Sequence, residues 1–138
     1  MEYESLGTEQ TKAIAKKLAK DFSSGVIALT GDLGAGKTTF TQGFAEGLGI
    51  KDKIISPTFV LMRIHKIPKS GRILYHIDLY RLEGKEQFLG LGLEEIIENP
   101  NNIILIEWAE KARDLLPKYT TWITFENVGE NIRKLIVT

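Results

Sequence analysis

The segment from Val26 to Phe40 changes abruptly in character, and this change limits the folds that the chain can adopt. An apolar run, Val26–Leu29, predicts a buried β-strand. Three glycines follow within residues 31–36, and the apolar spacing of Lys37–Gly47 then predicts a helix. Glycine weakens strands and helices alike, so this cluster indicates that the backbone must turn tightly or approach something closely.

The sequence of this loop, GDLGAGKT at Gly31–Thr38, fits the phosphate-binding pattern G-x-x-x-x-G-K-[ST]. Glycines let backbone amides surround an anion, and the N-terminus of the following helix adds free amides and a positive dipole end. Lys37 can reach the β- and γ-phosphates of a nucleotide, and the hydroxyl of Thr38 suits Mg²⁺. We therefore predict a nucleotide site here rather than a simple connecting turn. We expect Lys37 to be exposed when the site holds no nucleotide.

The loop pattern identifies neither the base nor the reaction. The D-x-x-G and N-K-x-D motifs of switch GTPases are absent from the sequence, so we expect ATP or ADP as the nucleotide. Two other classes of function stay open. One is a small-molecule kinase, although the sequence has no arginine-rich lid segment, and the other is a nucleotide-binding assembly factor without enzymatic activity.

Two further segments place acidic side chains where a nucleotide site could use them. The run Ile103–Ile106 predicts a second buried strand, and Glu107 follows at its carboxyl end, the position of a Walker-B acid that helps to hold Mg²⁺. In the strand predicted over residues 72–80, alternation puts His76, Asp78 and Tyr80 on one face, so Asp78 is a candidate to face the phosphates or the metal. The alternatives are that Glu107 merely leaves the core, that this face is the wet side of an edge strand, and that His76 is structural.

The remaining pattern predicts one α/β domain over residues 1–138, since this length supports one core and is too short for two. The other predicted elements are a helix over 8–22 capped by Thr8, strands over 58–67 and 72–80 joined as a hairpin, helices over 93–98 and 109–116, and strands over 122–125 and 133–137. Buried strands that alternate with helices predict a fold like that of the P-loop NTPases. Its sheet would be mixed, with a parallel centre and flanking helices.

The composition argues against several classes of protein. The 18 basic and 18 acidic residues give a formal net charge of zero, which argues against strong binding to nucleic acid by this chain alone. No stretch approaches the roughly 20 apolar residues of a membrane span, and the first residues lack the pattern of a signal peptide. The absence of cysteine excludes disulfides. We therefore expect a cytoplasmic protein.

Taken together, these segments resemble the TsaE (YjeE) family of small bacterial ATPases, which takes part in making threonylcarbamoyladenosine in tRNA. The matching segments are GDLGAGKTTFTQGFAEGLGI at 31–50, SPTF at 56–59, YHIDLYRL at 75–82 and LIEW at 105–108. The phosphate loop alone is shared by many families, whereas the combination and its spacing are specific.

The resemblance implies an ATP site and the residues that form it. The residues implied to bind the nucleotide are Gly34, Ala35, Gly36, Lys37, Thr38, Thr39 and, near the base, Arg133. Thr38 and Glu107 would hold Mg²⁺, and Asp78 would be a second acid near the metal or the attacking water. The residues implied to take part in catalysis are Lys37, Asp78 and Glu107. The Ser56–Thr58 loop would sense the nucleotide.

The resemblance also implies partners. Family members act with the TsaB–TsaD pair, in which TsaD is thought to transfer the threonylcarbamoyl group, so ATP hydrolysis by this chain would reset that complex. The chain would meet tRNA only indirectly, through the complex. None of the five arginines lies in the phosphate loop, so we expect slow hydrolysis by the chain alone and faster hydrolysis with the partner.

Overall fold

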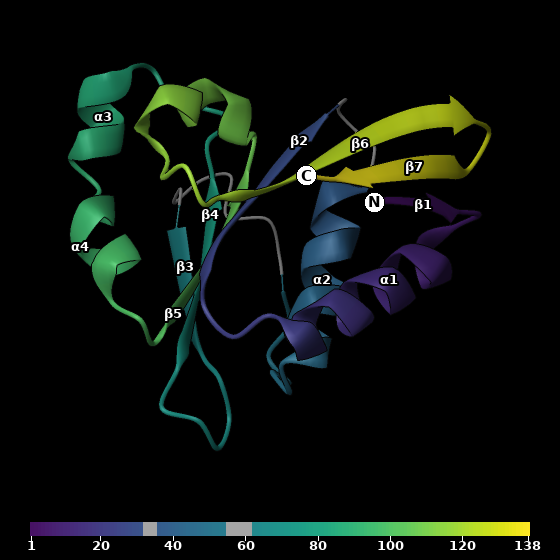
Figure 1. The fold of residues 1–138 in the computed structure, drawn as a ribbon, viewed down its shortest axis with the longest axis horizontal. Helices are drawn as coiled ribbons and strands as arrows, with labels where there is room; N and C mark the ends of the chain where they lie inside the picture. Colours follow the sequence, from purple (N-terminus) through teal and green to yellow (C-terminus); the bar gives the residue numbers. More distant parts are fainter. Residues whose placement is uncertain (32–35, 55–61) are drawn as a thin grey trace.

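The computed structural model describes residues 1–31, 36–54 and 62–138 of the chain. A seven-stranded sheet runs through the middle, in the order β1-β7-β6-β2-β5-β4-β3 (Figure 1). The strands are β1 (Glu2–Ser5), β2 (Gly25–Gly31), β3 (Met62–Lys66), β4 (Ile73–Asp78), β5 (Asn102–Glu107), β6 (Thr121–Gly129) and β7 (Ile132–Val137). The helices are α1 (Thr8–Asp21), α2 (Lys37–Gly47), α3 (Lys85–Leu89), α4 (Leu93–Glu98) and a 3₁₀ helix, η1 (Ala109–Leu115).

The centre of the sheet is parallel and its edges are antiparallel. β4, β5, β2 and β6 run in the same direction, whereas β3, β7 and β1 pair antiparallel with their neighbours. The predicted mixed α/β sheet with a parallel centre is therefore confirmed. Because parallel strands end at the same edge, Gly31 of β2, Glu107 of β5 and Asp78 of β4 all lie at one end of the sheet.

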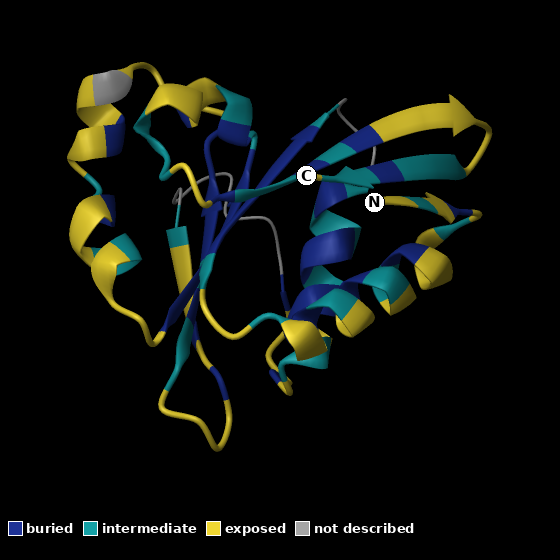
Figure 2. Cartoon of the chain, viewed as in Figure 1, coloured by how far each residue is buried: buried dark blue, intermediate teal, exposed yellow. Residues whose placement is uncertain are grey.

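Each face of the sheet has its own hydrophobic core. α1 and α2 cover one face, and α3, α4 and η1 lie on the other side (Figure 1). On the first face the Phe40 ring lies 5.6 Å from that of Phe125 and 6.1 Å from that of Phe44. All six residues of β5 are buried, and Figure 2 shows the central strands in dark blue. This double coverage explains why β2 and β5 have continuous apolar runs instead of alternating patterns.

Most predicted elements are confirmed, including α2 and α4 with the bounds that the sequence indicated and the β3–β4 hairpin. Thr8 is not the N-cap of α1 as predicted, because Gly7 takes that position without a side-chain hydrogen bond. β1 and α3 were not predicted, and the helix after β5 is a 3₁₀ helix. Residues 58–61 of one predicted strand lie outside the described residues. None of the helices that the structure describes is long and apolar enough to cross a membrane.

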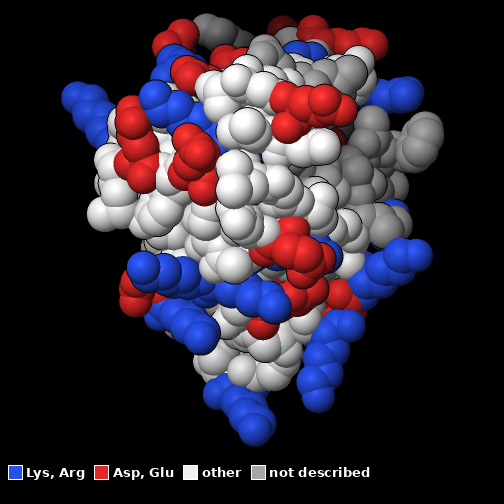
Figure 3. Space-filling model, turned by 90° about the vertical axis from the view of Figure 1, so that its right-hand side faces the viewer, with Lys and Arg blue, Asp and Glu red and all other residues white. Residues whose placement is uncertain are grey.

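Of the four lysines of α1, Lys12 is half-buried and Lys16, Lys17 and Lys20 are exposed. Figure 3 shows basic side chains over the lower half of the face that it presents, with acidic side chains between them. Nζ of Lys16 lies 3.0 Å from a carboxylate oxygen of Glu46 in α2. The hydrogen bond from Lys16, and then the charges of Lys16 and Lys12, hold the pKa of the Glu46 carboxyl below its usual range. These lysines therefore take part in exposed α1–α2 contacts.

Candidate functional site

The described ends of the glycine loop are Gly31, which closes β2, and Gly36, which precedes α2. Both have a positive φ, 132° at Gly31 and 99° at Gly36, a region that other residues rarely adopt. A Cβ at Gly31 would also lie only 2.3 Å from the carbonyl oxygen of Phe125 in β6. Glycine is therefore required at Gly31 by its conformation and by the close approach of a neighbouring strand. Gly34 and Ala35, and the loop of residues 56–58 expected to sense the nucleotide, lie outside the described residues.

The N-terminus of α2 can receive an anion. The helix begins at Lys37, so Lys37, Thr38 and Thr39 form its first turn. The first amides of a helix have no partner within the helix. No side chain of the described residues caps this end, and the first turn contains no acidic residue. The positive end of the helix dipole therefore points to the end of the glycine loop with no acidic side chain in the first turn, an arrangement that suits an anion.

Lys37 is buried, which corrects the expectation that it is exposed when the site holds no nucleotide. Only 5% of the residue is accessible. Its Nζ donates a hydrogen bond of 2.7 Å to the carbonyl oxygen of Gly31 and lies 4.0 Å from the centre of the Trp108 ring. A buried ammonium needs such partners, and the carbonyl and the aromatic face supply them.

Thr38, Glu107 and His76 meet at the carboxyl end of the sheet. The hydroxyl of Thr38 donates a hydrogen bond of 3.0 Å to Oε1 of Glu107, and Nε2 of His76 contacts Oε2. Glu107 is directly opposite Asp78 in the β4–β5 register, and Oδ1 of Asp78 accepts the backbone N–H of Tyr80 at 2.8 Å. The structure therefore places the two predicted acids side by side.

The alternative of a wet edge strand is wrong for His76 and Asp78, whereas Tyr80 lies beyond the end of β4 and is exposed. His76 is 0% and Asp78 3% accessible, and β4 has neighbours on both sides. The simple alternation was nevertheless correct, because Ile77 and Leu79 lie in the core on the opposite face of the sheet. Glu107, at 2% accessibility, has hydrogen-bond partners and does not lead out into solvent.

The residues at this point fit a magnesium ion that arrives with a nucleotide. Mg²⁺ prefers oxygen ligands, and the Thr38 hydroxyl and the Glu107 carboxylate are both of this kind. Within the described ranges, no group of three or more His, Asp or Glu residues is arranged to hold a metal. Mg²⁺ often keeps several waters and binds through one or two protein groups plus phosphate oxygens, so this sparse ligand set is appropriate.

Arg133 lies in a small pocket beside the start of α2. The pocket, of about 140 Å³, is lined by Gly7, Thr8, Thr11, Gly36, Thr39, Asn131 and Arg133. The structure thus brings Arg133 and Thr39 together with the end of the glycine loop. The contributions of the first turn of α1 and of Asn131 were not predicted, since no sequence pattern links these segments to the loop.

Two residues that follow β5, Trp108 and Glu110, also lie beside the candidate site. The sequence indicated no role for either of them. Trp108 has a left-handed backbone, with φ 58°, and its ring lies 5.1 Å from that of Tyr80. The carboxylate of Glu110 accepts a hydrogen bond from the hydroxyl of Thr30, which ties η1 to the end of β2. The signal that could have identified both is their position beyond the carboxyl end of a buried strand.

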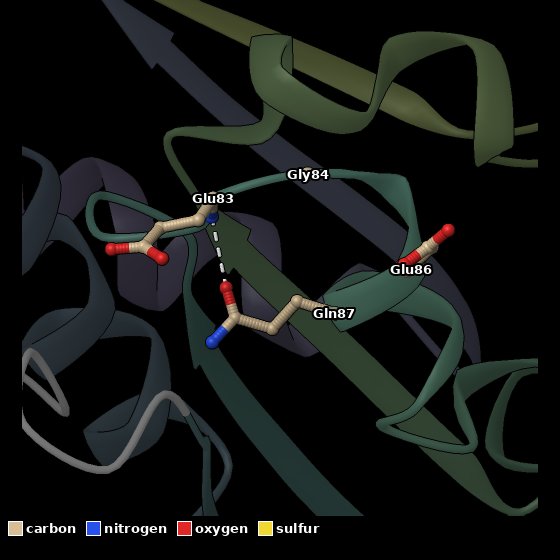
Figure 4. Close-up of a pocket in the computed structure, with 4 residues that line it drawn as sticks. All are labelled: Glu83, Gly84, Glu86 and Gln87. Carbon is tan, nitrogen blue, oxygen red and sulfur yellow. Dashed lines mark hydrogen bonds between the residues drawn. The ribbon is translucent and has the colours of Figure 1, made fainter.

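A separate hollow lies at the start of α3 and is a poorer candidate. It is lined by Glu83, Gly84, Glu86 and Gln87, and the side-chain oxygen of Gln87 accepts the backbone N–H of Glu83 at 2.8 Å (Figure 4). Two carboxylates at one hollow disfavour the phosphates of a nucleotide. The end of the sheet beside α2 is therefore the better candidate site.

Comparison with known proteins gives the family. The family model described as "Threonylcarbamoyl adenosine biosynthesis protein TsaE" matches residues 6–135. The chain belongs to the TsaE family. This TsaE chain is 40% identical over 140 residues to the tRNA threonylcarbamoyladenosine biosynthesis protein TsaE of Bacillus subtilis, a match that covers 100% of the chain and 85% of the relative.

Two further matches agree with this assignment. The protein of the same name from Treponema pallidum is 40% identical over 113 residues, which cover 81% of this chain and 80% of that protein. The crystal structure of Bacillus subtilis YdiB is similar in fold, with a TM-score of 0.83 and 36% identity over 99% of this chain and 83% of that one. The resemblance seen in the sequence motifs is thus confirmed, together with the fold class.

Proposed function

We propose that this TsaE-family chain binds ATP with Mg²⁺ and hydrolyses it in the biosynthesis of threonylcarbamoyladenosine in tRNA, acting in the cytoplasm with the TsaB–TsaD pair. One observation carries the proposal. The hydroxyl of Thr38, in the first turn of the helix after the glycine loop, is bonded to Glu107 at the end of a neighbouring parallel strand. Helix, hydroxyl and carboxylate in this arrangement are the parts that a P-loop NTPase needs for phosphate and metal.

Each residue has a role that its position supports. The amides at the start of α2 and the ammonium of Lys37 bind the β- and γ-phosphates, while Thr38 and Glu107 hold Mg²⁺. When bound, Mg²⁺ supplies positive charge that stabilises the phosphoryl group in the transition state. Asp78, directly opposite Glu107, orients the attacking water. The Arg133 pocket receives the base.

The positions of two arginines support activation by a partner. Nη1 of Arg72 donates to the carbonyl of Ser23, before the start of β2, and the guanidinium of Arg113 lies 4.0 Å from the centre of the Trp122 ring. These contacts engage both arginines with groups other than Thr38 and Glu107. An arginine supplied by a partner can accelerate phosphoryl transfer by about 10³–10⁵-fold. TsaB–TsaD is the proposed source of that cation.

The test is phosphate release from MgATP by the chain alone, with tRNA, and with the TsaB–TsaD pair, all at equal ionic strength. We expect slow release by the chain alone, little change with tRNA, and a rise with the protein pair. Fast hydrolysis by the isolated chain, or stimulation by tRNA without protein partners, would contradict the proposal. Acceptor-dependent loss of ATP without free phosphate would indicate a kinase instead. Modification activity that survives loss of Glu107 would indicate an assembly factor without hydrolysis.

A further inference from the structure

His76 is a buried histidine to which the proposed function assigns no role. It lies within β4, it is 0% accessible, and its ring reaches diagonally from β4 to the end of β5. Nε2 contacts Oε2 of Glu107, and Nδ1 is buried with no hydrogen-bond partner among the residues that the structure describes. The two ring nitrogens therefore have very different surroundings.

These surroundings determine where the proton lies on the ring. An ionised carboxylate only accepts hydrogen bonds, so its contact with His76 requires an N–H at Nε2. The geometry thus identifies Nε2 as the ring nitrogen that donates to Glu107.

The contact between Nε2 of His76 and Oε2 of Glu107 fixes the orientation of the Glu107 carboxylate. With Oε2 held by His76, Oε1 faces the hydroxyl of Thr38, which donates to it at 3.0 Å. The hydroxyl hydrogen of Thr38 is then directed toward the carboxylate, and its oxygen lone pairs remain available to a cation. Without the histidine, the carboxylate of Glu107 could rotate and this alignment would be lost.

We propose that His76 is a positioning residue for the Mg²⁺ site, acting as an Nε2–H donor that anchors Glu107 in line with Thr38. This inference rests on the proposed function, because Thr38 and Glu107 are the groups assigned there to the metal. Residues that orient metal ligands in this way typically contribute about 10–100-fold to metal affinity.

A binding experiment tests the positioning role without using hydrolysis. Calorimetry gives the affinity for ATP with Mg²⁺ and with a chelator, and the ratio of the two measures the contribution of the metal. His76→Asn and His76→Gln form a matched pair, since the amide nitrogen of Gln can occupy the place of Nε2 whereas that of Asn is too short to reach Glu107. We expect the ratio to fall about tenfold or more in His76→Asn and to be largely restored in His76→Gln, with metal-free affinity unchanged in both. Equal ratios in native protein and a folded His76→Asn variant would overturn the proposal.

Nitrogen NMR of the native protein tests the tautomer independently of any nucleotide. The chain has only two histidines, so His65→Gln, on β3, assigns the remaining ring signals to His76. We expect a proton on Nε2. A ring protonated at Nδ1 alone would refute the inference even if His76→Asn does not fold. Native protein that binds no ATP would instead refute the proposed function, and the tautomer would still decide whether His76 holds Glu107 as described.

Discussion

The helices α1 and α2 touch backbone to backbone, and Gly43 of α2 is the point at which this contact can be tested. A Cβ at Gly43 would lie 2.6 Å from both the Cα and the carbonyl oxygen of Lys12. Ordinary contact begins at 3.4 Å, so α1 would have to move away by about 0.8 Å to accept the methyl group of alanine. Because the opposing atoms belong to the backbone, no side-chain rotation can relieve the clash.

The cost of Gly43→Ala follows from this displacement. A gap of roughly 0.5–1 Å removes a quarter to a half of the dispersion attraction between the separated atoms. Such an insertion typically costs about 1–3 kcal/mol, and alanine returns up to about 1 kcal/mol through its higher helix propensity. We expect a net loss of about 1–2 kcal/mol in the free energy of unfolding. For a domain of this size, that lowers the melting temperature by roughly 3–8 °C.

Thermal unfolding followed by circular dichroism, without nucleotide, measures this effect. Gly90→Ala is a suitable control, because Gly90 has a helical φ of −68° and a Cβ there would lie 3.4 Å and 3.5 Å from two carbonyl oxygens, which is ordinary contact. We expect the control to stay within about 0.5 kcal/mol of native protein. A Gly43→Ala variant that melts at or above the native temperature would refute the close packing of α1 on α2.

Three further predictions concern charged and polar groups. Lys37→Ala should leave the fold intact and weaken ATP binding about tenfold or more, because it removes a charge-assisted hydrogen bond to the phosphates; unchanged affinity by calorimetry would exclude this lysine from binding. Thr38→Ala and Glu107→Ala should reduce Mg²⁺-dependent phosphate release more than ATP affinity, since the loop amides and Lys37 still hold the phosphates; a native rate in Glu107→Ala would transfer its role to the other acid of the site. Lys16→Ala should raise the pKa of Glu46 toward its usual value in an NMR titration, because Lys16 lowers that pKa. A pKa of Glu46 that does not move in Lys16→Ala would contradict the contact. In the native protein, the pair stabilises the fold at pH values above the unfolded pKa of Glu46, and this stabilisation is lost as the pH falls through the lower folded pKa.

The spacing of apolar residues along the sequence predicted the features that depend on neighbouring residues, such as helix bounds and the face on which a strand residue lies. The bounds of α2 followed from its apolar spacing and from the glycine loop that must precede it. The alternation of β4 correctly separated His76 from Ile77. β1 was missed because a four-residue strand shows too little alternation to be recognised, and it exists through its pairing with β7.

Contacts between distant segments were beyond the reach of the sequence. Lys37 is buried because Trp108, which follows a different strand, covers its ammonium. The partner of His76 depends on β5 being the neighbour of β4 and on the register that places Glu107 opposite Asp78. Alternation gives the face on which a side chain lies, but strand order decides which side chain of the next strand it meets.

The position of β2 also sets the order in which this molecule can assemble. Among the strands that the structure describes, β2 pairs with β5 and β6, so Gly25 can pair only once Ile103 has been made and Ile27 only once Thr121 has been made. During synthesis, the glycine loop and its strand leave the ribosome long before either neighbour exists. Contacts between such distant segments make folding slow, and the unpaired edges of β2 stay exposed meanwhile. A nucleotide bound as proposed would therefore gain its full set of contacts, and stabilise the fold through them, only after Arg133 has been made.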